Sequence, residues 1–200
     1  VRLLQGEQKI LSLEPTSLNG ILKTIEQVAK FTGTTETGRE IVAKLQRKID
    51  RSMALVASAQ SHPRVFAMEW LDPPMSGGHW VPEMIEAAGG VDHLGSKFRP
   101  SSEVSWSQIS QYDPQIVILM PCGYDLEQTS KEALHIAFPE EWHSTEAVIT
   151  GQVYTVDGSA YFNRPGPRIV DGLQILTEII HPELSPRQSP IHAWQPFNKK

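Results

Sequence analysis

Two stretches of the chain combine aromatic, histidine, methionine and arginine side chains with glycine and proline. The first follows an apolar run at residues 65–68, and the second follows another at residues 153–156. Aromatic rings in such loops are poor core material and suit the flat wall of a pocket for a large, partly apolar ligand. Arginine adds planar donors for carbonyl or phosphate oxygens. The candidate ligand-binding side chains are Trp70, Met75, His79 and Trp80 in the first stretch and Tyr161, Phe162 and Arg164 in the second.

Each of these side chains also has a purely structural interpretation. Trp70 and Phe162 would pack against helix ends, and His79 would orient its own loop through a backbone contact. The gathering of several such residues at one predicted edge favours ligand binding, but the residue types leave both alternatives open.

Catalytic and metal-binding patterns are missing from the sequence. The lone Cys122 follows a buried strand, and no neighbouring residue offers an evident base to make it a nucleophile. The seven histidines form neither an HExxH motif nor an i,i+4 pair, and there is no GxSxG, Walker loop or GxGxxG. The sequence therefore predicts no catalytic residue, no metal site and no resident cofactor.

Composition excludes further classes of protein. The 200 residues include 18 Lys+Arg and 23 Asp+Glu, which gives a formal net charge of −5. A nucleic-acid partner is not expected, because the only basic run is the terminal Lys199-Lys200. No apolar run is long enough to span a bilayer. One cysteine allows no internal disulfide.

Three successive strand–loop–helix units predict an α/β fold with an open, mostly parallel sheet and flanking helices. Strands are expected at residues 64–70, 116–120 and 153–156, with helices at 81–88, 126–137 and 169–180. Ligands bind such sheets beyond the carboxyl ends of the strands, where both candidate stretches lie. This α/β unit would cover residues 63–185, and a Pro-rich, irregular tail would follow at 186–200.

The segment before residue 63 has a different character. A short strand is expected at residues 9–13, a helix from Thr16 or Ser17 to Gly33, and a long helix at residues 35–58. These elements cannot form a sheet alone, so residues 1–33 are interpreted as the remnant of a second lobe and residues 34–62 as a linker helix. The first residues have neither an initiator methionine nor a signal-peptide pattern, which indicates a processed or truncated chain.

Several phrases resemble the C-terminal half of the cobalamin-binding, substrate-binding proteins of ABC transporters. The resemblance covers residues 9–183, most of the chain. The phrases are Glu69-Trp70-Leu71-Asp72-Pro73, residues 78–90 (GHWVPEMIEAAGG), residues 113–117 (DPQIV), Pro121-Cys122-Gly123 and residues 161–168 (YFNRPGPR).

The resemblance implies one lobe of a two-lobe periplasmic-binding-protein-like fold, with the lobes joined by a long helix and the ligand held between them. It implies a non-catalytic protein, outside the cytoplasm, that captures a corrinoid and delivers it to an ABC transporter permease. It adds Trp106, in Val104-Ser105-Trp106, to the candidate ligand-binding residues, although composition alone would make Trp106 a core tryptophan.

One departure and two alternatives accompany the resemblance. The place where relatives carry a surface carboxylate for docking on the permease holds Tyr112, with Asp113 next to it. Haem or ferric-siderophore carriers share the architecture, although a siderophore carrier would be expected to place more arginine in the pocket. A regulatory or interaction domain that kept the fold is the other alternative.

Overall fold

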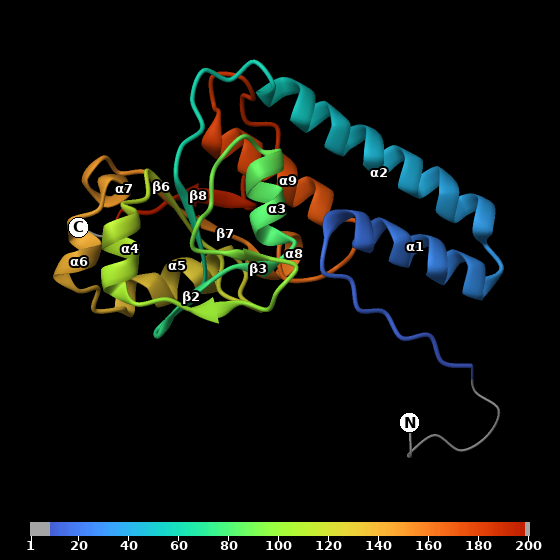
Figure 1. Ribbon diagram of the computed structural model, residues 1–200, viewed down its shortest axis with the longest axis horizontal. Coiled ribbons are helices and arrows are strands. Elements are labelled where there is room, and N and C mark those ends of the chain that lie inside the picture. The colour runs from blue at the N-terminus through green and yellow to red at the C-terminus, as the bar shows by residue number, and fades with distance from the viewer. Residues whose placement is uncertain (1–8, 199–200) are drawn as a thin grey trace.

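The computed structural model, which describes residues 9–198, contains a mixed six-stranded sheet with helices on both faces (Figure 1). The strand order is β5-β2-β1-β6-β7-β8. The three central strands are parallel, and antiparallel strands flank them on both sides. The strands are β1 (Val65–Leu71), β2 (Pro74–Ser76), β5 (Ser102–Glu103), β6 (Ile116–Leu119), β7 (Val153–Val156) and β8 (Trp194–Pro196).

The central strands are buried on both faces, because each face carries its own helices. Val65 and Ala67 of β1 belong to one hydrophobic cluster, and Phe66 and Met68 belong to the other, as the period of two in a strand requires. Helices α3 (Val81–Ala87) and α9 (Ile169–Ile180) cover the first face. The second face is covered by α4 (Trp106–Tyr112), α5 (Leu126–His135), α6 (Glu140–His143) and α7 (Glu146–Ile149).

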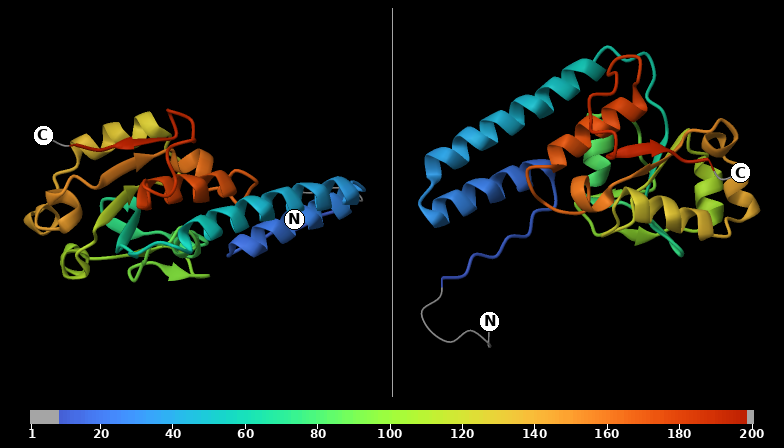
Figure 2. Two further views of the ribbon diagram at one scale, coloured as in Figure 1. Left: turned by 90° about the horizontal axis from the view of Figure 1, so that it is seen from above. Right: turned by 180° about the vertical axis from the view of Figure 1, so that it is seen from behind.

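The N-terminal helices α1 (Leu18–Thr32) and α2 (Thr35–Val56) form an antiparallel hairpin that extends away from the sheet (Figures 1 and 2). The hydroxyl of Ser17 caps α1 by accepting from the Gly20 N–H at 2.9 Å, and Gly33 ends it with a positive φ of 76°. Leu45 of α2 packs into the core beside α3 and α9. Leu18, Ile21 and Leu22 of α1 belong to the same cluster, and the Leu18 N–H donates to Glu83 Oε2 on α3 at 2.8 Å. The hairpin is therefore attached to the α/β body both through α2 and through the N-terminal end of α1.

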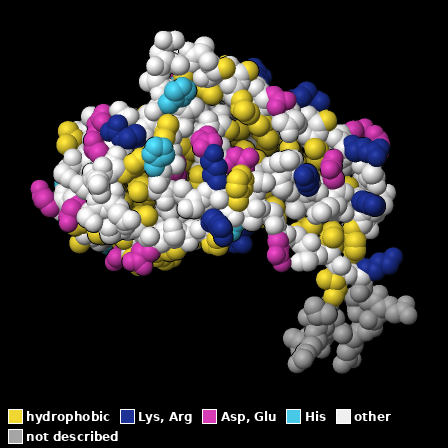
Figure 3. Space-filling model, viewed as in Figure 1, with side chains coloured by type: hydrophobic (Ala, Val, Ile, Leu, Met, Phe, Trp, Pro, Cys, Tyr) yellow, Lys and Arg dark blue, Asp and Glu magenta, His cyan; other side chains and the backbone are white. Residues whose placement is uncertain are grey.

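Exposed hydrophobic side chains occur along the hairpin and the segment before it. Figure 3 shows hydrophobic side chains at the lower right, next to the start of the described chain. Monomeric proteins rarely expose adjoining apolar groups of this kind unless another surface covers them. The residues are Ile10, Leu11, Leu13, Val28, Phe31, Ile41, Met53 and Leu55.

Two predictions of secondary structure are wrong. Residues 9–13 form no strand, since no described strand lies beside them to pair with their backbone groups. The tail is not irregular throughout: β8 pairs with β7, with Gln195 opposite Thr155. Residues 199–200, also assigned to the tail, and residues 1–8, assigned to the N-terminal remnant, lie outside the described residues.

The other predicted strands and helices are confirmed, with small shifts at their ends. The strand at residues 153–156 matches β7, and the long helix ends at Val56 rather than at residue 58. The loop after β1 contains two further short strands, and the loop after β7 contains a short helix. These additional elements are β2, β3 (Gly78–His79) and α8 (Gly158–Tyr161). None of the helices within residues 9–198 is long and apolar enough to cross a membrane.

Candidate functional site

Three loops leave the carboxyl ends of β1, β6 and β7, and hydrogen bonds tie them to one another. The Cys122 N–H donates to the Glu69 carbonyl at 3.0 Å, which joins the loop after β6 to the C-terminal part of β1. The Ser159 N–H donates to the Tyr124 carbonyl at 2.9 Å, and the Gly123 N–H donates to Asn163 Oδ1 at 3.2 Å. These bonds fix the relative positions of the loops before any ligand arrives.

Trp70 presents an aromatic ring to solvent near the carboxyl end of β1. Its side chain is 37% exposed, and its Nε1–H donates to the Asp72 carbonyl at 3.1 Å. The Tyr124 ring meets it edge-on, with 5.8 Å between ring centroids. The two rings line a hollow of about 60 Å³ together with Leu71, Asp72, Pro121, Glu132 and Ile136. Sequence reasoning missed Tyr124, although it is an aromatic residue in a loop that directly follows a buried strand.

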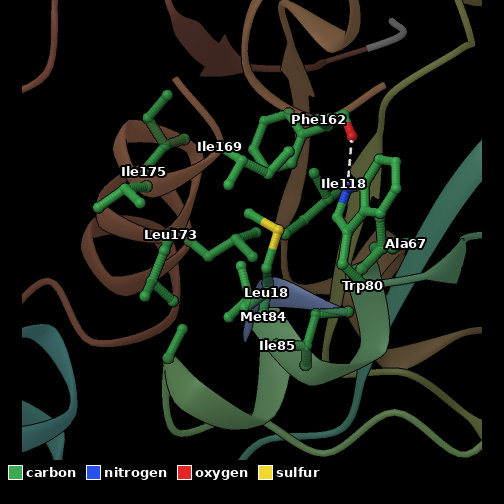
Figure 4. Packing of buried hydrophobic residues seen from close by; sticks show 14 of the residues in the cluster. Leu18, Ala67, Trp80, Met84, Ile85, Ile118, Phe162, Ile169, Leu173 and Ile175 are labelled. Atoms are coloured by element: carbon green, nitrogen blue, oxygen red, sulfur yellow. Dashed lines mark hydrogen bonds between the residues drawn. The ribbon is translucent and has the colours of Figure 1, made fainter. Parts of the chain in front are cut away.

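Trp80 and Phe162 are placed in the hydrophobic core. Phe162 is 0% exposed, and its backbone carbonyl accepts from the Trp80 indole N–H at 2.8 Å (Figure 4). The Met84 and Ile169 side chains lie beside these rings. In this structure both aromatic side chains therefore connect α3 to the loop after β7 and offer little surface to a ligand.

The other predicted ligand-binding residues lie in β2, in β3 and in the segment after β7. Met75 is half-buried in β2 and lies opposite Trp70 in the β1–β2 register. Tyr161 is half-buried and lines a cavity of about 280 Å³ beside α9, and burial raises the pKa of its phenol. Arg164 is exposed in the loop after α8. His79 is half-buried, with a positive φ of 52°.

Trp106 lies in a separate aromatic cluster on the other face of the sheet. Its ring contacts Phe138 and Trp142 edge-on, with centroid distances of 5.9 and 6.1 Å. Phe138 and Trp142 stack at 4.3 Å. Among residues 9–198, no ring contact joins Trp106 to Trp70. The half-buried Trp106 ring thus has packing partners of its own.

Tyr112 and Asp113 are engaged within the molecule. The Tyr112 hydroxyl donates to the Val91 carbonyl at 2.6 Å, and burial raises the pKa of Tyr112 to about 12. The Asp113 carboxylate accepts from Arg64 Nη2 at 3.3 Å and from the Glu146 N–H at 2.8 Å. Asp113 therefore joins β1 to the N-terminus of α7.

The described residues contain no group of three or more His, Cys, Asp or Glu side chains that could hold a metal ion. Cys122 is free and exposed. The carboxyl ends of the strands thus carry the Trp70 and Tyr124 rings, and the loop after α8 adds the exposed Arg164. Such a surface is suited to binding a flat, partly apolar molecule.

Asp92, in the loop between α3 and β4 (Ser96–Lys97), has an unusual environment. Its Oδ1 accepts from the Leu94 and Gly95 N–H groups at 2.9 and 2.8 Å, while its buried Oδ2 has no partner among residues 9–198. Burial raises its pKa from 3.8 to about 6, and the Glu86 carboxylate acts in the same direction. The folded protein therefore holds this proton more tightly than the unfolded chain.

The raised pKa predicts a pH-dependent stability. Between about pH 4 and pH 6 the folded state binds more protons, so the free energy of unfolding falls as the pH rises, by up to about 3 kcal/mol.

Asp92→Asn keeps the Oδ1 acceptor and removes the charge. Urea unfolding should show the variant more stable than the parent by about 1–3 kcal/mol at pH 7.5 and equally stable near pH 4. An Asp72→Asn control at an exposed position should show neither effect, and a pH-independent gain in Asp92→Asn would contradict the assignment.

Comparisons with known proteins agree with this fold. The curated vitamin B12-binding protein of Vibrio cholerae serotype O1 is 23% identical over 172 residues, which are 82% of this chain and 57% of the relative. The chain thus spans a little more than half the length of the curated relatives it matches. The crystal structure of a periplasmic vitamin B12 binding protein of Vibrio cholerae has a TM-score of 0.70 and 20% identity over 90% of this chain and 68% of that chain. A periplasmic heme binding protein from Pseudomonas aeruginosa has a TM-score of 0.75 and 16% identity over 95% of this chain and 68% of that chain.

A match to a sequence family carries more weight than these single relatives. Residues 2–160 match the family described as periplasmic binding protein, and the mostly parallel sheet with its flanking helices agrees with the solved structures. Since the matched region is well over half of the sequence, this chain belongs to the periplasmic binding protein family.

Proposed function

We propose that this chain is the C-terminal lobe and linker helix of a non-catalytic solute-binding protein that holds cobalamin between two lobes. The observation that carries the proposal is the partly exposed Trp70 ring near the carboxyl end of β1, with Tyr124 of the loop after β6 against its edge and hydrogen bonds that tie this loop to β1 and to the segment after β7. Aromatic rings on fixed loops bind a flat macrocycle at little entropic cost.

A corrinoid suits this edge better than a ferric siderophore. Trp70, Tyr124 and Met75 offer apolar surface, while the loop after β7 contributes only Arg164 and Arg168 as cations. An anionic siderophore would need more positive charge for tight binding. Haem is the second candidate ligand, because its macrocycle is flat and largely apolar and because one structural relative is named as a heme binding protein.

The exposed hydrophobic side chains of residues 10–41 support the proposal of a second lobe. In this proposal, residues 9–33 belong to that lobe and α2 joins the two, while residues 63–185 form the lobe described above. A single lobe contacts only one side of a ligand, so the isolated chain should bind more weakly than a two-lobe protein. The protein would act in the periplasm or another extracytoplasmic space and deliver its ligand to an ABC transporter permease.

Tryptophan fluorescence tests the proposed ligand directly. Cyanocobalamin and haemin would each be titrated into the chain, with correction for absorbance by the ligand. Saturable quenching by cyanocobalamin, and weaker or no quenching by haemin, would support the proposal. Stronger quenching by haemin would replace cobalamin with haem. If neither ligand quenches this chain or a two-lobe protein that contains it, the proposed function is wrong.

Trp70→Ala should weaken the binding of cyanocobalamin about tenfold or more. The substitution removes one aromatic face, and 1.4 kcal/mol of lost contact corresponds to a factor of ten in Kd. Trp70→Phe keeps a ring at the same position and should restore most of the affinity. Isothermal titration calorimetry gives the three Kd values, and equal values for parent and Trp70→Ala would remove Trp70 from the site.

A further inference from the structure

Two residues with side chains, His79 and Phe98, have a left-handed backbone conformation next to the candidate site. Their φ angles are 52° and 62°. This region is unfavourable for residues other than glycine, and it is a true outlier for a bulky side chain such as phenylalanine. Strained residues of this kind concentrate at functional sites, where the surrounding structure holds them in place.

The backbone around Phe98 is held by reciprocal hydrogen bonds. The Phe98 N–H donates to the His79 carbonyl at 2.9 Å, and the His79 N–H donates to the Arg99 carbonyl at 2.6 Å. Strands β3 and β4 pair in parallel directly before these residues, with His79 opposite Lys97. The turn at residues 97–99 therefore keeps a fixed position relative to His79.

Close packing attaches this turn to the end of β1. A Cβ atom at Gly78 would lie 2.4 Å from the Ser101 nitrogen, so only glycine allows the two backbones to approach this closely. The Ser101 hydroxyl donates to Glu69 Oε2 at 2.5 Å, and Glu69 immediately precedes Trp70.

The turn also has an indirect connection to the loop after β7. His79 is followed by Trp80, whose indole N–H donates to the Phe162 carbonyl at 2.8 Å. The Phe98 turn is thereby linked to two of the three loops that form the candidate site.

Packing does not account for the strained conformation of Phe98. Its side chain is 54% exposed, and no ring contact joins it to another aromatic residue among residues 9–198. The fold thus bears the cost of a left-handed phenylalanine without burying its ring. Glycine at this position would adopt the same positive φ with less conformational strain.

We propose that Phe98 is a further ligand-contact residue, which extends the aromatic surface of the candidate site beyond Trp70 in β1 and the loop that carries Arg164. This inference rests on the proposed function. The ring provides an apolar face for a macrocyclic ligand, and the neighbouring exposed Arg99 provides donors for oxygen acceptors at its periphery.

The variant Phe98→Gly separates ligand contact from stability. It removes the ring and the strain of the left-handed backbone, so the melting temperature should stay the same or rise by a few degrees. Cyanocobalamin should bind about fivefold or more weakly, because the ring no longer contacts it. Phe98→Tyr keeps the ring and should bind as the parent does. Phe31→Ala, a 46% exposed phenylalanine on the far helix α1, is the control and should leave the Kd unchanged.

Each outcome has a distinct meaning. Weaker binding by Phe98→Gly at an unchanged or higher melting temperature supports the inference. Unchanged binding overturns it while the proposed function stands. Weaker binding together with a melting temperature lower by about 5 °C or more assigns Phe98 to packing and also overturns it. If the parent binds neither cyanocobalamin nor haemin, even within a two-lobe protein, the proposed function fails and the inference fails with it.

Discussion

Replacement of Glu178 by alanine is expected to lower the free energy of unfolding by about 3–5 kcal/mol. Glu178 lies on α9 and is 2% exposed. Its Oε1 accepts from the Gln188 and Ser189 N–H groups at 2.9 and 3.0 Å, and its Oε2 accepts from the Ser189 hydroxyl at 2.5 Å and the Trp194 indole at 3.3 Å. Alanine would leave the Gln188 and Ser189 donors without this acceptor, at about 1–3 kcal/mol for each that stays buried. The Trp194 indole would keep the Ser189 hydroxyl, which accepts from it at 2.9 Å.

Glu178→Gln tests whether the acceptor capacity matters rather than the packing. Glutamine fills the same volume but presents an NH₂ group to donors, so it should also destabilise the fold, by about 2–4 kcal/mol. Urea unfolding measures both variants. The control is Glu40→Ala on α2, which removes an exposed carboxylate and should change stability by less than about 1 kcal/mol. If both Glu178 variants unfold like the parent, the tail does not depend on this carboxylate.

Replacement of Phe162 by alanine should have an effect of similar size, about 3–5 kcal/mol. The ring is completely buried against α3 and α9, so alanine would remove its contacts and leave a cavity. The urea midpoint should fall with little change in its m-value.

Trp70→Ala and Phe162→Ala should have opposite effects on stability and on ligand binding. Trp70→Ala should change stability by about 1 kcal/mol or less, since the ring is partly exposed, but should weaken ligand binding. Phe162→Ala should mainly lower the free energy of unfolding and should affect ligand binding less. A Phe162→Ala protein as stable as the parent would show that the loop after β7 does not depend on this ring.

Much of the fold could be predicted from the sequence because the central strands have a strong local signal. The run Ile116–Leu119 is apolar throughout, as expected for a strand buried on both faces, and β7 was predicted with its observed ends. The prediction failed where pairing decides the structure. Residues 9–13 are as apolar as a strand but have no neighbour, whereas Trp194–Pro196 form a strand because β7 lies beside them.

The candidate site could be predicted only in part. The sequence indicates which loops lie at the carboxyl edge, because that follows from strand order. It cannot show which aromatic side chain is buried: Trp70, near the end of β1, stays partly exposed, whereas Phe162, directly after α8, is buried by packing against α3 and α9. The positive φ of Phe98 could not be predicted from the sequence either, because phenylalanine rarely adopts this backbone conformation.

The attachment of α2 has a mechanical consequence. Its 22 residues make a rod of about 33 Å. The C-terminal half is embedded beside α9, while the Thr35 end contacts only α1 in the described chain. A rotation of about 5° at the embedded end would move the far end by about 3 Å over such a length. A small change in the packing of α2 on α9 would therefore move the Thr35 end, and the α1 helix joined to it, over a much larger distance.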